Sequence, residues 1–536
     1  MNAFIRVLLM LVTVVSSSAT ADEGMWLFSD LPKKLLKQRY EFEPTDDWAR
    51  HVMLSSVRFN VGGSGSFVSS TGLVLTNHHV ASDTLYKLSS AERNIAKDGY
   101  LASGPESELK APDLELNVLT DILDVTERVR SAVAAGLSAD EAAKARRAVM
   151  AEIEKESLDA TGLRSDVVTL YGGEKFHLYR YRKYTDVRLV WAPEAAIAFF
   201  GGDADNFEYP RYCLDVTLFR VYENDRPAKI EHFLQWAETP VAEEDLVFVS
   251  GNPGRTQRLF TVDALKHLRD VRNPYVLDFL RRKEILLQQF GLNGQEQKRR
   301  AQDDLFGIQN SRKAYTGMLN GLQNPSIIAA KLQSETDLLK AVRGHSAVKH
   351  HATAWEEIAQ LQHDKAKLQG TVYSFRSRLY DLAETLVLMA AEDLKPSADR
   401  LREFRESARE SLEQDLFSTA PIYEDLERVK LADELARLTE KRGRDDSLVS
   451  QVLNGKSPAD RAAELIGTTK LIDVDQRRAL ASGGKTAIEE SPDPLIRLAQ
   501  LMEPELRAYR ERSEALDEAE RQAYARISEA TVAVSG

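Results

Sequence analysis

Several features that would narrow the function are scarce in this sequence of 536 residues. Cysteine occurs once, at Cys213, so the chain forms no intrachain disulfide. Beyond the N-terminal segment, no apolar run approaches the roughly 20 residues that a membrane-spanning helix needs. Basic clusters are scarce too, because the short run at 298–300 has acidic neighbours and the net charge is −12. We therefore expect no membrane span and no nucleic-acid partner, since a phosphate backbone requires a clustered basic face.

The N-terminus has the features of a secretory signal peptide. Arg6 precedes an apolar run at 7–15, and small residues follow, ending in Ala19-Thr20-Ala21. The run is too short to span a bilayer, and the A-x-A pattern suits cleavage before Asp22. We expect residues 1–21 to be removed and the mature protein to be periplasmic or secreted.

The first half of the chain carries strand signals between about residues 56 and 260. Hydrophobic residues make up 43% and charged residues 29% of the sequence, which with this length indicates two or more soluble domains. Alternating or β-branched runs bounded by turn residues predict strands. These runs are GSFVSSTGLVLTN (65–77, a hairpin), DVRLVWAP (186–193), LDVTLFRVYENDRPA (214–228) and DLVFVSGNPGR (245–255, ending in a Gly-Pro loop). A capping box of Ser138 and Glu141 predicts one helix within this half.

Helical periodicity replaces the strand signals after about residue 260. Apolar residues in the stretch 371–390 recur at steps of three and four, which is typical of an amphipathic helix; they are Val372, Phe375, Leu379, Leu382, Leu386 and Met389. Similar stripes recur towards the C-terminus, with prolines between them. We therefore expect a mixed β plus α fold, with a β lobe at 22–260 and a helical domain at 261–536.

Two adjacent histidines, His78 and His79, follow the hairpin strand. If the strand ends at these residues, it can place an imidazole ring in a cleft. For an isolated His-His sequence, however, the usual interpretation is two ordinary surface histidines. A shared metal ion is disfavoured, because adjacent strand residues point to opposite faces. The remaining candidates lack i, i+4 spacing (His345, His350 and His351), so we expect no metal and no cofactor.

Three serines have surroundings that superficially suit a nucleophile. Ser64 and Ser66 lie in GGSGSF, on the first arm of the predicted hairpin, and Ser250 lies at the end of a predicted strand. An extended strand lacks the sharp turn whose backbone N–H groups form an oxyanion hole. A Gly-Pro turn is also the ordinary interpretation of the segment after Ser250. We expect all three serines to be structural.

Five stretches together resemble the bacterial serine dipeptidyl-peptidase family, which includes dipeptidyl aminopeptidase BII and dipeptidyl-peptidases seven and eleven. They are EGMWLFSDLP, GLVLTNHHV, FGGDADNFEYPR with LDVTLFRVY, SGNPGRT and QNSRKAYTGMLNGL. The resemblance runs from about residue 22 to the end of the chain. It implies an exported enzyme that removes dipeptides from peptides with free N-termini and commonly forms homodimers. The implied fold is a chymotrypsin-like double β-barrel with an inserted helical domain, without metal.

The resemblance makes His79 the general base and Asp215 the residue that orients it. The sequence agrees, because a carboxylate within an apolar strand pattern needs a hydrogen-bond donor such as an imidazole N–H. A salt bridge from Asp215 to Arg220 is the alternative. Asp203 and Asp205 are rival acids, but their glycine-rich surroundings indicate a loop.

The same resemblance makes Asn206 the residue that hydrogen-bonds the substrate's α-amino group, with Phe207 beside it. Family members usually carry Trp at the second position, so Phe207 is a departure that removes an indole N–H donor. The alternative for Asn206 is that it caps the turn formed by GGDADN, a common role of asparagine.

A nucleophile is the part of the active site that we do not find in the sequence. The G-N-S-G-S-P motif of the family is absent, and the resemblance places it in a second barrel beyond the helical domain. We therefore expect a chain in which the second barrel is largely missing and which is inactive as given. The alternatives are a non-catalytic peptide-binding protein on a peptidase scaffold and a periplasmic double-barrel endopeptidase.

Overall fold

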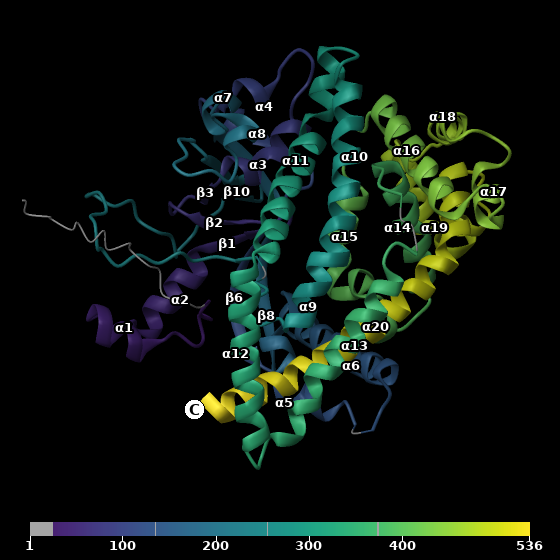
Figure 1. Ribbon diagram of the computed structural model, residues 1–536. Helices are drawn as coiled ribbons and strands as arrows, with labels where there is room; N and C mark the ends of the chain where they lie inside the picture. Colours follow the sequence, from purple (N-terminus) through teal and green to yellow (C-terminus); the bar gives the residue numbers. More distant parts are fainter. Residues whose placement is uncertain (1–24, 135, 255, 372–374, 536) are drawn as a thin grey trace, which may run out of the picture.

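The computed structural model describes residues 25–134, 136–254, 256–371 and 375–535. The predicted signal peptide at 1–21 lies outside these residues. Figure 1 shows the strands beside the long helices α10, α11 and α12, with helices α14, α16, α17, α18 and α19 on the other side of these three. The expected mixed β plus α architecture is present.

The named strands form one antiparallel sheet. Their order is β4-β9-β10-β3-β2-β1-β6-β8-β7, with β11 paired to β10 and β5 paired to β9. The strands are β1 (Ser56–Phe59), β2 (Ser64–Phe67), β3 (Leu73–Thr76), β4 (Tyr100–Leu101), β5 (Leu109–Lys110), β6 (Leu116–Asp124), β7 (Arg164–Leu170), β8 (Lys175–Tyr184), β9 (Asp186–Ala192), β10 (Thr217–Glu223) and β11 (Arg226–Pro227).

Most of the sheet curves around one apolar core, and β7 and β8 also contribute to a second, smaller buried cluster. Strands far apart in the order contribute to the same buried cluster, and the ring centroids of Phe59 on β1 and Phe219 on β10 lie 6.0 Å apart. Phe67 on β2 meets Tyr184 on β8 edge to face, also with centroids 6.0 Å apart. Within the described residues, the end strands β4 and β7 do not pair with each other. The sheet is therefore curved, but its hydrogen bonding does not close a ring.

Most of the strands predicted from the sequence are present. β2 and β3 form the predicted hairpin, and β9 covers the predicted strand at 186–193. β10 and β11 are joined by a two-residue turn in which Asn224 and Asp225 have φ angles of 51° and 58°. Asparagine and aspartate tolerate this left-handed conformation better than other non-glycine residues, which explains the tight turn.

The strand predicted at the start of 245–255 is wrong. Residues 228–254 contain neither a strand nor a helix. A strand is stable only where a neighbouring strand accepts and donates its backbone hydrogen bonds, and no such neighbour lies against this stretch in the described structure. The side chains of Val247 and Val249 are consequently 61% and 99% exposed.

Short helices and one long helix accompany the sheet. The long one, α6, begins at the predicted capping box, where the Ser138 N–H donates to the Glu141 carboxylate at 2.9 Å. The helices of this half are α1 (Lys33–Tyr40), α2 (Asp46–Ser55), α3 (His78–Lys87), α4 (Ile95–Asp98), α5 (Thr126–Ser131), α6 (Ala139–Thr161), α7 (Ala195–Ala198) and α8 (Gly202–Asp205).

The described residues beyond 260 form helices and no strand. None of the described helices is both long and apolar enough to cross a bilayer. The α-helices of this half are α9 (Val262–His267), α10 (Asn273–Gly291), α11 (Gln295–Gln323), α12 (Pro325–Gly344), α13 (Ala354–Leu368), α14 (Arg378–Glu392), α15 (Glu406–Leu416), α16 (Glu424–Arg442), α17 (Ser447–Leu453), α18 (Pro458–Thr468), α19 (Val474–Glu489) and α20 (Pro494–Ser535).

The apolar stripe predicted around residues 372–389 lies mainly on α14. Leu379, Leu382, Leu386 and Met389 are all buried in the largest helical core. The helix begins later than predicted, at Arg378, so Phe375 is buried but precedes it. Val372 lies outside the described residues.

Candidate active site

The histidine pair opens a helix rather than ending a strand. β3 ends at Thr76, and α3 begins at His78. Asn77 holds the extended conformation of a residue that precedes a helix, with φ −78° and ψ 148°, and its side-chain amide donates to the Asp215 carbonyl at 3.0 Å. The prediction that His79 lies at the end of a strand is therefore wrong, because His79 lies in the first turn of α3.

Asp215 contacts both the ring and the backbone of His79. The ring atom Nδ1 lies 2.7 Å from Asp215 Oδ2, and the His79 backbone N–H donates to Oδ1 at 3.0 Å. The second contact satisfies one of the N–H groups that every helix leaves unpaired in its first turn. Strand pairing explains the meeting, because Thr76 at the end of β3 faces Thr217 at the start of β10.

Arg220, the alternative partner of Asp215, forms its hydrogen bonds with other residues. Arg220 Nε donates to the buried Glu108 carboxylate at 2.9 Å, and its Nη1 donates to the Thr71 carbonyl at 2.9 Å. Since Asp215 precedes β10 while Arg220 lies in its middle, the two side chains belong to different environments. The salt bridge considered from the sequence is not formed.

The electrostatics of the pair keep Asp215 ionised. Burial by itself would raise the pKa of the Asp215 carboxyl, but the hydrogen bonds from the His79 ring and backbone outweigh it and lower the pKa below its ordinary value. Burial lowers the pKa of the neighbouring His78, whose Nε2 has no hydrogen-bond partner among the described residues. The two histidines therefore differ: His79 is paired and half exposed, whereas His78 is buried.

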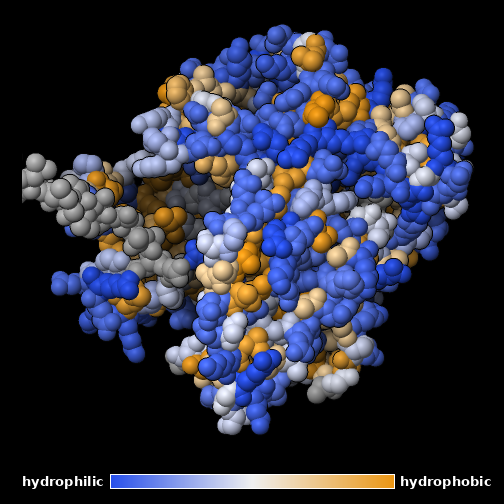
Figure 2. All heavy atoms as spheres, in the orientation of Figure 1, coloured by the Kyte–Doolittle hydropathy of each residue, from blue (hydrophilic) through white to orange (hydrophobic). Residues whose placement is uncertain are grey.

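A cavity of about 1240 Å³ opens beside this pair. Its walls come from both halves of the chain, with His79 and Asp215 from the sheet half and Asn310 from α11. Asn206 and Phe207, the two residues predicted to bind substrate, line it as well. The space-filling view in Figure 2 shows a hollow with hydrophobic residues beside β1, β2 and β3.

Asn206 is buried and bonded on both ends of its amide. Its Nδ2 donates to Asn310 Oδ1 at 2.9 Å, and its Oδ1 accepts from Arg211 Nη1 at 3.2 Å. An amide oxygen has two lone pairs, so Oδ1 retains one further acceptor site. Asn206 also directly follows α8, so its backbone is part of the turn considered from the sequence.

Phe207 is exposed and conformationally strained. Its side chain is 61% exposed and its φ angle is +62°, in the left-handed region that non-glycine residues rarely adopt. The ring is thus held out at the cavity wall by the backbone rather than by packing.

Two contacts at this wall were not identified from the sequence. Asn310 and Arg211 both hydrogen-bond Asn206, although neither was singled out. Asn310 belongs to the stretch QNSRKAYTGMLNGL, but a polar residue on a helix surface carries no signal of its own. Only the packing of α11 against α8 reveals it.

The rival carboxylates Asp203 and Asp205 lie in the one-turn helix α8 rather than in a loop. Arg312 Nη2 donates to Asp203 Oδ2 at 2.7 Å, and Lys313 Nζ donates to the Asp203 carbonyl at 2.8 Å. These contacts tie α8 to α11 and give Asp203 a structural partner.

The three candidate serines make structural contacts or none. Ser64 Oγ accepts from the Asn252 N–H at 2.7 Å, and Ser250 Oγ accepts from Ser56 Oγ at 2.9 Å. Ser66 lies in β2, as predicted for the first arm of the hairpin. In the described part of the chain, no serine hydroxyl hydrogen-bonds the His79 ring. The described residues likewise contain no group of three or more His, Cys, Asp or Glu side chains placed to hold a metal ion.

Comparison with known proteins agrees with this fold. The crystal structure of Porphyromonas endodontalis DPP11 in complex with the dipeptide Arg-Glu superposes with a TM-score of 0.73 at 21% identity, covering 96% of this chain and 78% of that chain. An Asp/Glu-specific dipeptidyl-peptidase of Shewanella putrefaciens is 27% identical over 529 residues, covering 92% of this chain and 70% of the relative.

Other curated relatives match over shorter segments. An Asp/Glu-specific dipeptidyl-peptidase of Porphyromonas endodontalis is 30% identical over 287 residues, or 49% of this chain. Dipeptidyl-peptidase 7 of Phocaeicola vulgatus is 28% identical over 361 residues, or 62% of this chain. The matches span only 40% and 50% of these two relatives. The profile of the Peptidase S46 family matches residues 21–536, so the chain belongs to the peptidase S46 family.

Proposed function

We propose that this chain carries the base and the amine-binding part of a serine-type dipeptidyl-peptidase, which releases dipeptides from peptides with free N-termini. The observation that carries the proposal is the contact between His79 Nδ1 and Asp215 Oδ2, 2.7 Å long, at the edge of a cavity that Asn206 also lines. The names of the relatives, which are dipeptidyl-peptidases, support the same substrate class.

The chemistry assigned to the pair is general base catalysis. Asp215 accepts the Nδ1–H of His79, so the tautomer leaves Nε2 free to accept a proton from a hydroxyl. The lowered pKa of Asp215 keeps this carboxyl negative, which stabilises the imidazolium that forms. His78 is a poor candidate for the same role, because it is buried and no carboxylate of the described residues hydrogen-bonds its ring.

The amine end is assigned to Asn206. An α-ammonium group has three donors, and the second lone pair of Asn206 Oδ1 can accept one of them. The Asn310 amide fixes the Asn206 side chain in place. Docking the amine here, in the cavity that His79 also lines, would limit the peptide between the two sites to a dipeptide.

We propose that the nucleophilic serine comes from polypeptide outside the described residues, in the second barrel of a chymotrypsin-like fold. The curvature of the sheet around one core supports such a barrel for the first lobe. Large apolar side chains on the irregular residues 228–254 and 256–260 are exposed, as expected of a surface that another element covers; they are Trp236, Val241, Val247, Phe248, Val249 and Leu259.

We further propose that the protein is exported to the periplasm or secreted, on the basis of the signal-like residues 1–21. N-terminal sequencing of the protein from its native host tests this, with a start at Asp22 as the expected result. A homodimer remains part of the proposal, and sedimentation velocity measures it.

Titration calorimetry of the purified chain with a free dipeptide tests the substrate class without requiring turnover. We expect binding of the free dipeptide and at least tenfold weaker binding of its N-acetylated form, because acetylation removes the ammonium donors. Asn206→Ala should remove most of this preference, whereas Asp205→Asn serves as a control on the adjacent α8. Equal binding of both dipeptides would contradict the assignment.

The catalytic part is tested with a fluorophosphonate serine probe and a dipeptidyl fluorogenic substrate. We expect no labelling of Ser64, Ser66 or Ser250, and hydrolysis only where a nucleophilic serine is present with this chain. In that form His79→Ala should reduce turnover by several orders of magnitude, because the residues of a triad act as a unit. Dipeptide binding without any such hydrolysis would favour the peptide-binding alternative, which the lack of a hydroxyl partner for His79 in the described residues supports.

A further inference from the structure

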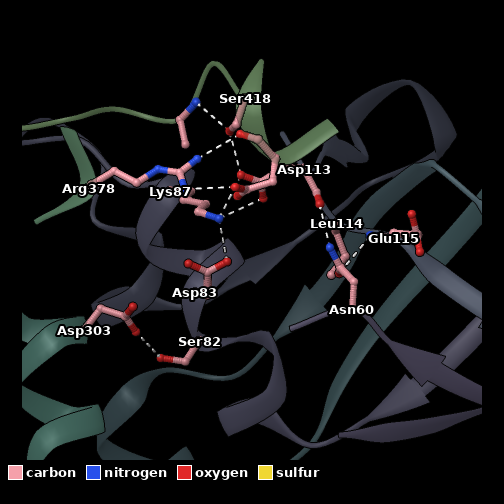
Figure 3. A network of polar contacts seen from close by, with 12 residues as sticks. Asn60, Ser82, Asp83, Lys87, Asp113, Leu114, Glu115, Asp303, Arg378 and Ser418 are labelled. Atoms are coloured by element: carbon pink, nitrogen blue, oxygen red, sulfur yellow. Dashed lines mark hydrogen bonds and ion pairs between the residues drawn. The ribbon is translucent and has the colours of Figure 1, made fainter. Parts of the chain in front are cut away.

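A carboxylate from the helical half reaches the helix that carries His79. Ser82 lies on α3, three residues after His79, and its hydroxyl donates to Asp303 Oδ1 at 3.0 Å. Asp303 belongs to α11 and lies seven residues before Asn310, which holds Asn206. Figure 3 shows Asp303 pointing at Ser82 from the neighbouring helix.

The surroundings of Asp303 are unusual for a carboxylate. Burial, together with the nearby carboxyls of Asp83 and Asp304, raises its pKa to about 6 against the opposing effects of the Ser82 hydroxyl and of Lys87. Burial raises the pKa of the phenol of Tyr86, one turn beyond Ser82 on α3, and the nearby Asp303 carboxyl raises it further. Burying a carboxylate costs free energy unless hydrogen bonds or opposite charges offset the lost hydration, and the Ser82 hydroxyl supplies one such hydrogen bond.

The far end of α3 is fixed as well. Lys87 Nζ lies 2.7 Å from Asp83 on its own helix and 2.8 Å from Asp113 of the sheet half. Ser418, from the helical half, donates to the other oxygen of Asp113 at 2.5 Å. In Figure 3 this network surrounds the last turn of α3, while the Ser82 contact lies one turn earlier. The Ser82 contact is thus the polar link between α11 and the part of α3 nearest to His79.

We propose that Asp303 is a positioning residue for His79, acting through Ser82 to hold α3 against α11. The inference rests on the proposed function of His79 as the base. Asp303 and Asn310 are seven residues apart on α11, about 10 Å along its axis. The same helix therefore contacts both the helix that carries the base and the amine-binding Asn206. α11 then sets the spacing between the amine site and the base.

The contact requires an acceptor at position 303, not a negative charge. A protonated carboxyl keeps one acceptor oxygen, and so does the amide of an asparagine. Asp303→Asn should therefore preserve the position of α3, and Asp303→Ala should release it. Ser82→Ala removes the donor of the same bond and should reproduce the effect of Asp303→Ala.

The test measures the tautomer of His79 in the chain as it exists, without a need for turnover. Protein labelled with ¹⁵N only in histidine gives two-bond ¹⁵N–¹H correlations of each ring, and His79→Gln assigns those of His79. We expect the Nδ1–H form in the unaltered chain, because Asp215 accepts that proton. In Asp303→Ala and Ser82→Ala the signals should move towards those of Asp215→Ala, while Asp303→Asn keeps the original pattern.

Two controls separate positioning from general stability. Asp304→Ala removes the neighbouring carboxylate on α11, which pairs with Lys430 instead, and should leave the His79 signals unchanged. Dipeptide binding should change by less than about twofold in Asp303→Ala, because Asn310 is intact. Equal loss of the His79 pattern, of dipeptide binding and of the melting temperature would show a merely structural role and overturn the proposal.

The outcomes also distinguish this inference from the proposed function. If the unaltered chain does not show the Nδ1–H form, the His79–Asp215 assignment itself fails. If it does, and both Asp303→Ala and Ser82→Ala leave the pattern intact, the positioning role is wrong while the proposed function stands. Should Asp303→Ala fail to fold, Ser82→Ala decides, since it removes a single hydroxyl oxygen.

Discussion

β10 and residues 245–250 carry the same sequence signal and have different structures. Both are short stretches with several apolar residues, including one phenylalanine and at least one valine each, and both were predicted to be strands. β10 lies between β3 and β9, and Phe219 and Val221 are fully buried. The stretch 245–250 has no neighbouring strand in the described structure, and Val249 is 99% exposed. An alternating pattern shows that a segment can form a strand, and a hydrogen-bonding neighbour decides whether it does.

The largest expected difference between the two segments is in amide hydrogen exchange. Backbone N–H groups of β10 should be protected nearly to the level of global unfolding, which for an ordinary domain means roughly a thousandfold or more. Those of residues 245–250 should exchange close to the rate of an unstructured peptide. Exchange followed by mass spectrometry of the purified chain measures both.

The same hydrogen-exchange measurement can also contradict the expected difference between β10 and residues 245–250. Strong protection of residues 245–250 in the isolated chain would mean that a strand partner forms in solution. Protection that appears only when additional polypeptide is supplied would instead support the proposed second barrel.

A pair of phenylalanines gives the next largest difference. Phe219→Ala on β10 should reduce the free energy of unfolding by about 3–5 kcal/mol, because it leaves a cavity in the core. Phe248→Ala should reduce it by about 1 kcal/mol, since the ring is 43% exposed and packs only edge-on or tilted against Trp48 and Phe42.

Urea unfolding followed by circular dichroism provides the comparison, with an unchanged m-value as the check for an intact native state. Equal losses for the two variants would show that the segment around Phe248 is as firmly packed as the sheet.

The comparison also shows which parts of the fold and of the candidate site can be predicted from the sequence. Turn residues and alternation located β2, β3, β9 and β10 correctly, because each strand has its neighbours within the same lobe. The contact between His79 and Asp215 was expected only through a resemblance, and the roles of both residues stay predictions. Neither alternation nor spacing could reveal that His79 lies in the first turn of a helix, since the Asp215 side chain that accepts the His79 backbone N–H is far away in sequence.

Contacts between the sheet half and the helical half could not be predicted from the sequence. Asn310, Arg312 and Asp303 all lie on α11 and act through partners on α8, in the adjoining turn or on α3. Polar residues on a helix surface are ordinary, and nothing local distinguishes those that face another element. Only the packing of α11 against the sheet half selects them.

Two serines on β2 test how the irregular segment around Asn252 is held against the sheet, with a smaller expected effect. Ser64 Oγ accepts the Asn252 N–H at 2.7 Å, which holds the irregular segment against the sheet. Ser64→Ala should therefore reduce the free energy of unfolding by about 0.5–1.5 kcal/mol and increase amide exchange around Asn252. Ser66→Ala, two residues along the same strand, is the matched control, because no described residue hydrogen-bonds its hydroxyl. A larger loss in Ser66→Ala than in Ser64→Ala would contradict this account of how the segment is held.

The smallest effect is expected at Val249. Its side chain is 99% exposed, so Val249→Ser removes no buried surface and should change the free energy of unfolding by less than about 0.5 kcal/mol. Val221→Ser in β10 is the matched control. It should reduce the free energy of unfolding strongly, because it places a hydroxyl at a fully buried position between apolar side chains. Thermal unfolding at two protein concentrations measures both. If Val249→Ser destabilises the chain by more than about 1 kcal/mol only at the higher concentration, the valine is buried between copies in solution. The same loss at both concentrations would mean that residues 245–250 pack within one chain, and the contrast with β10 would then disappear.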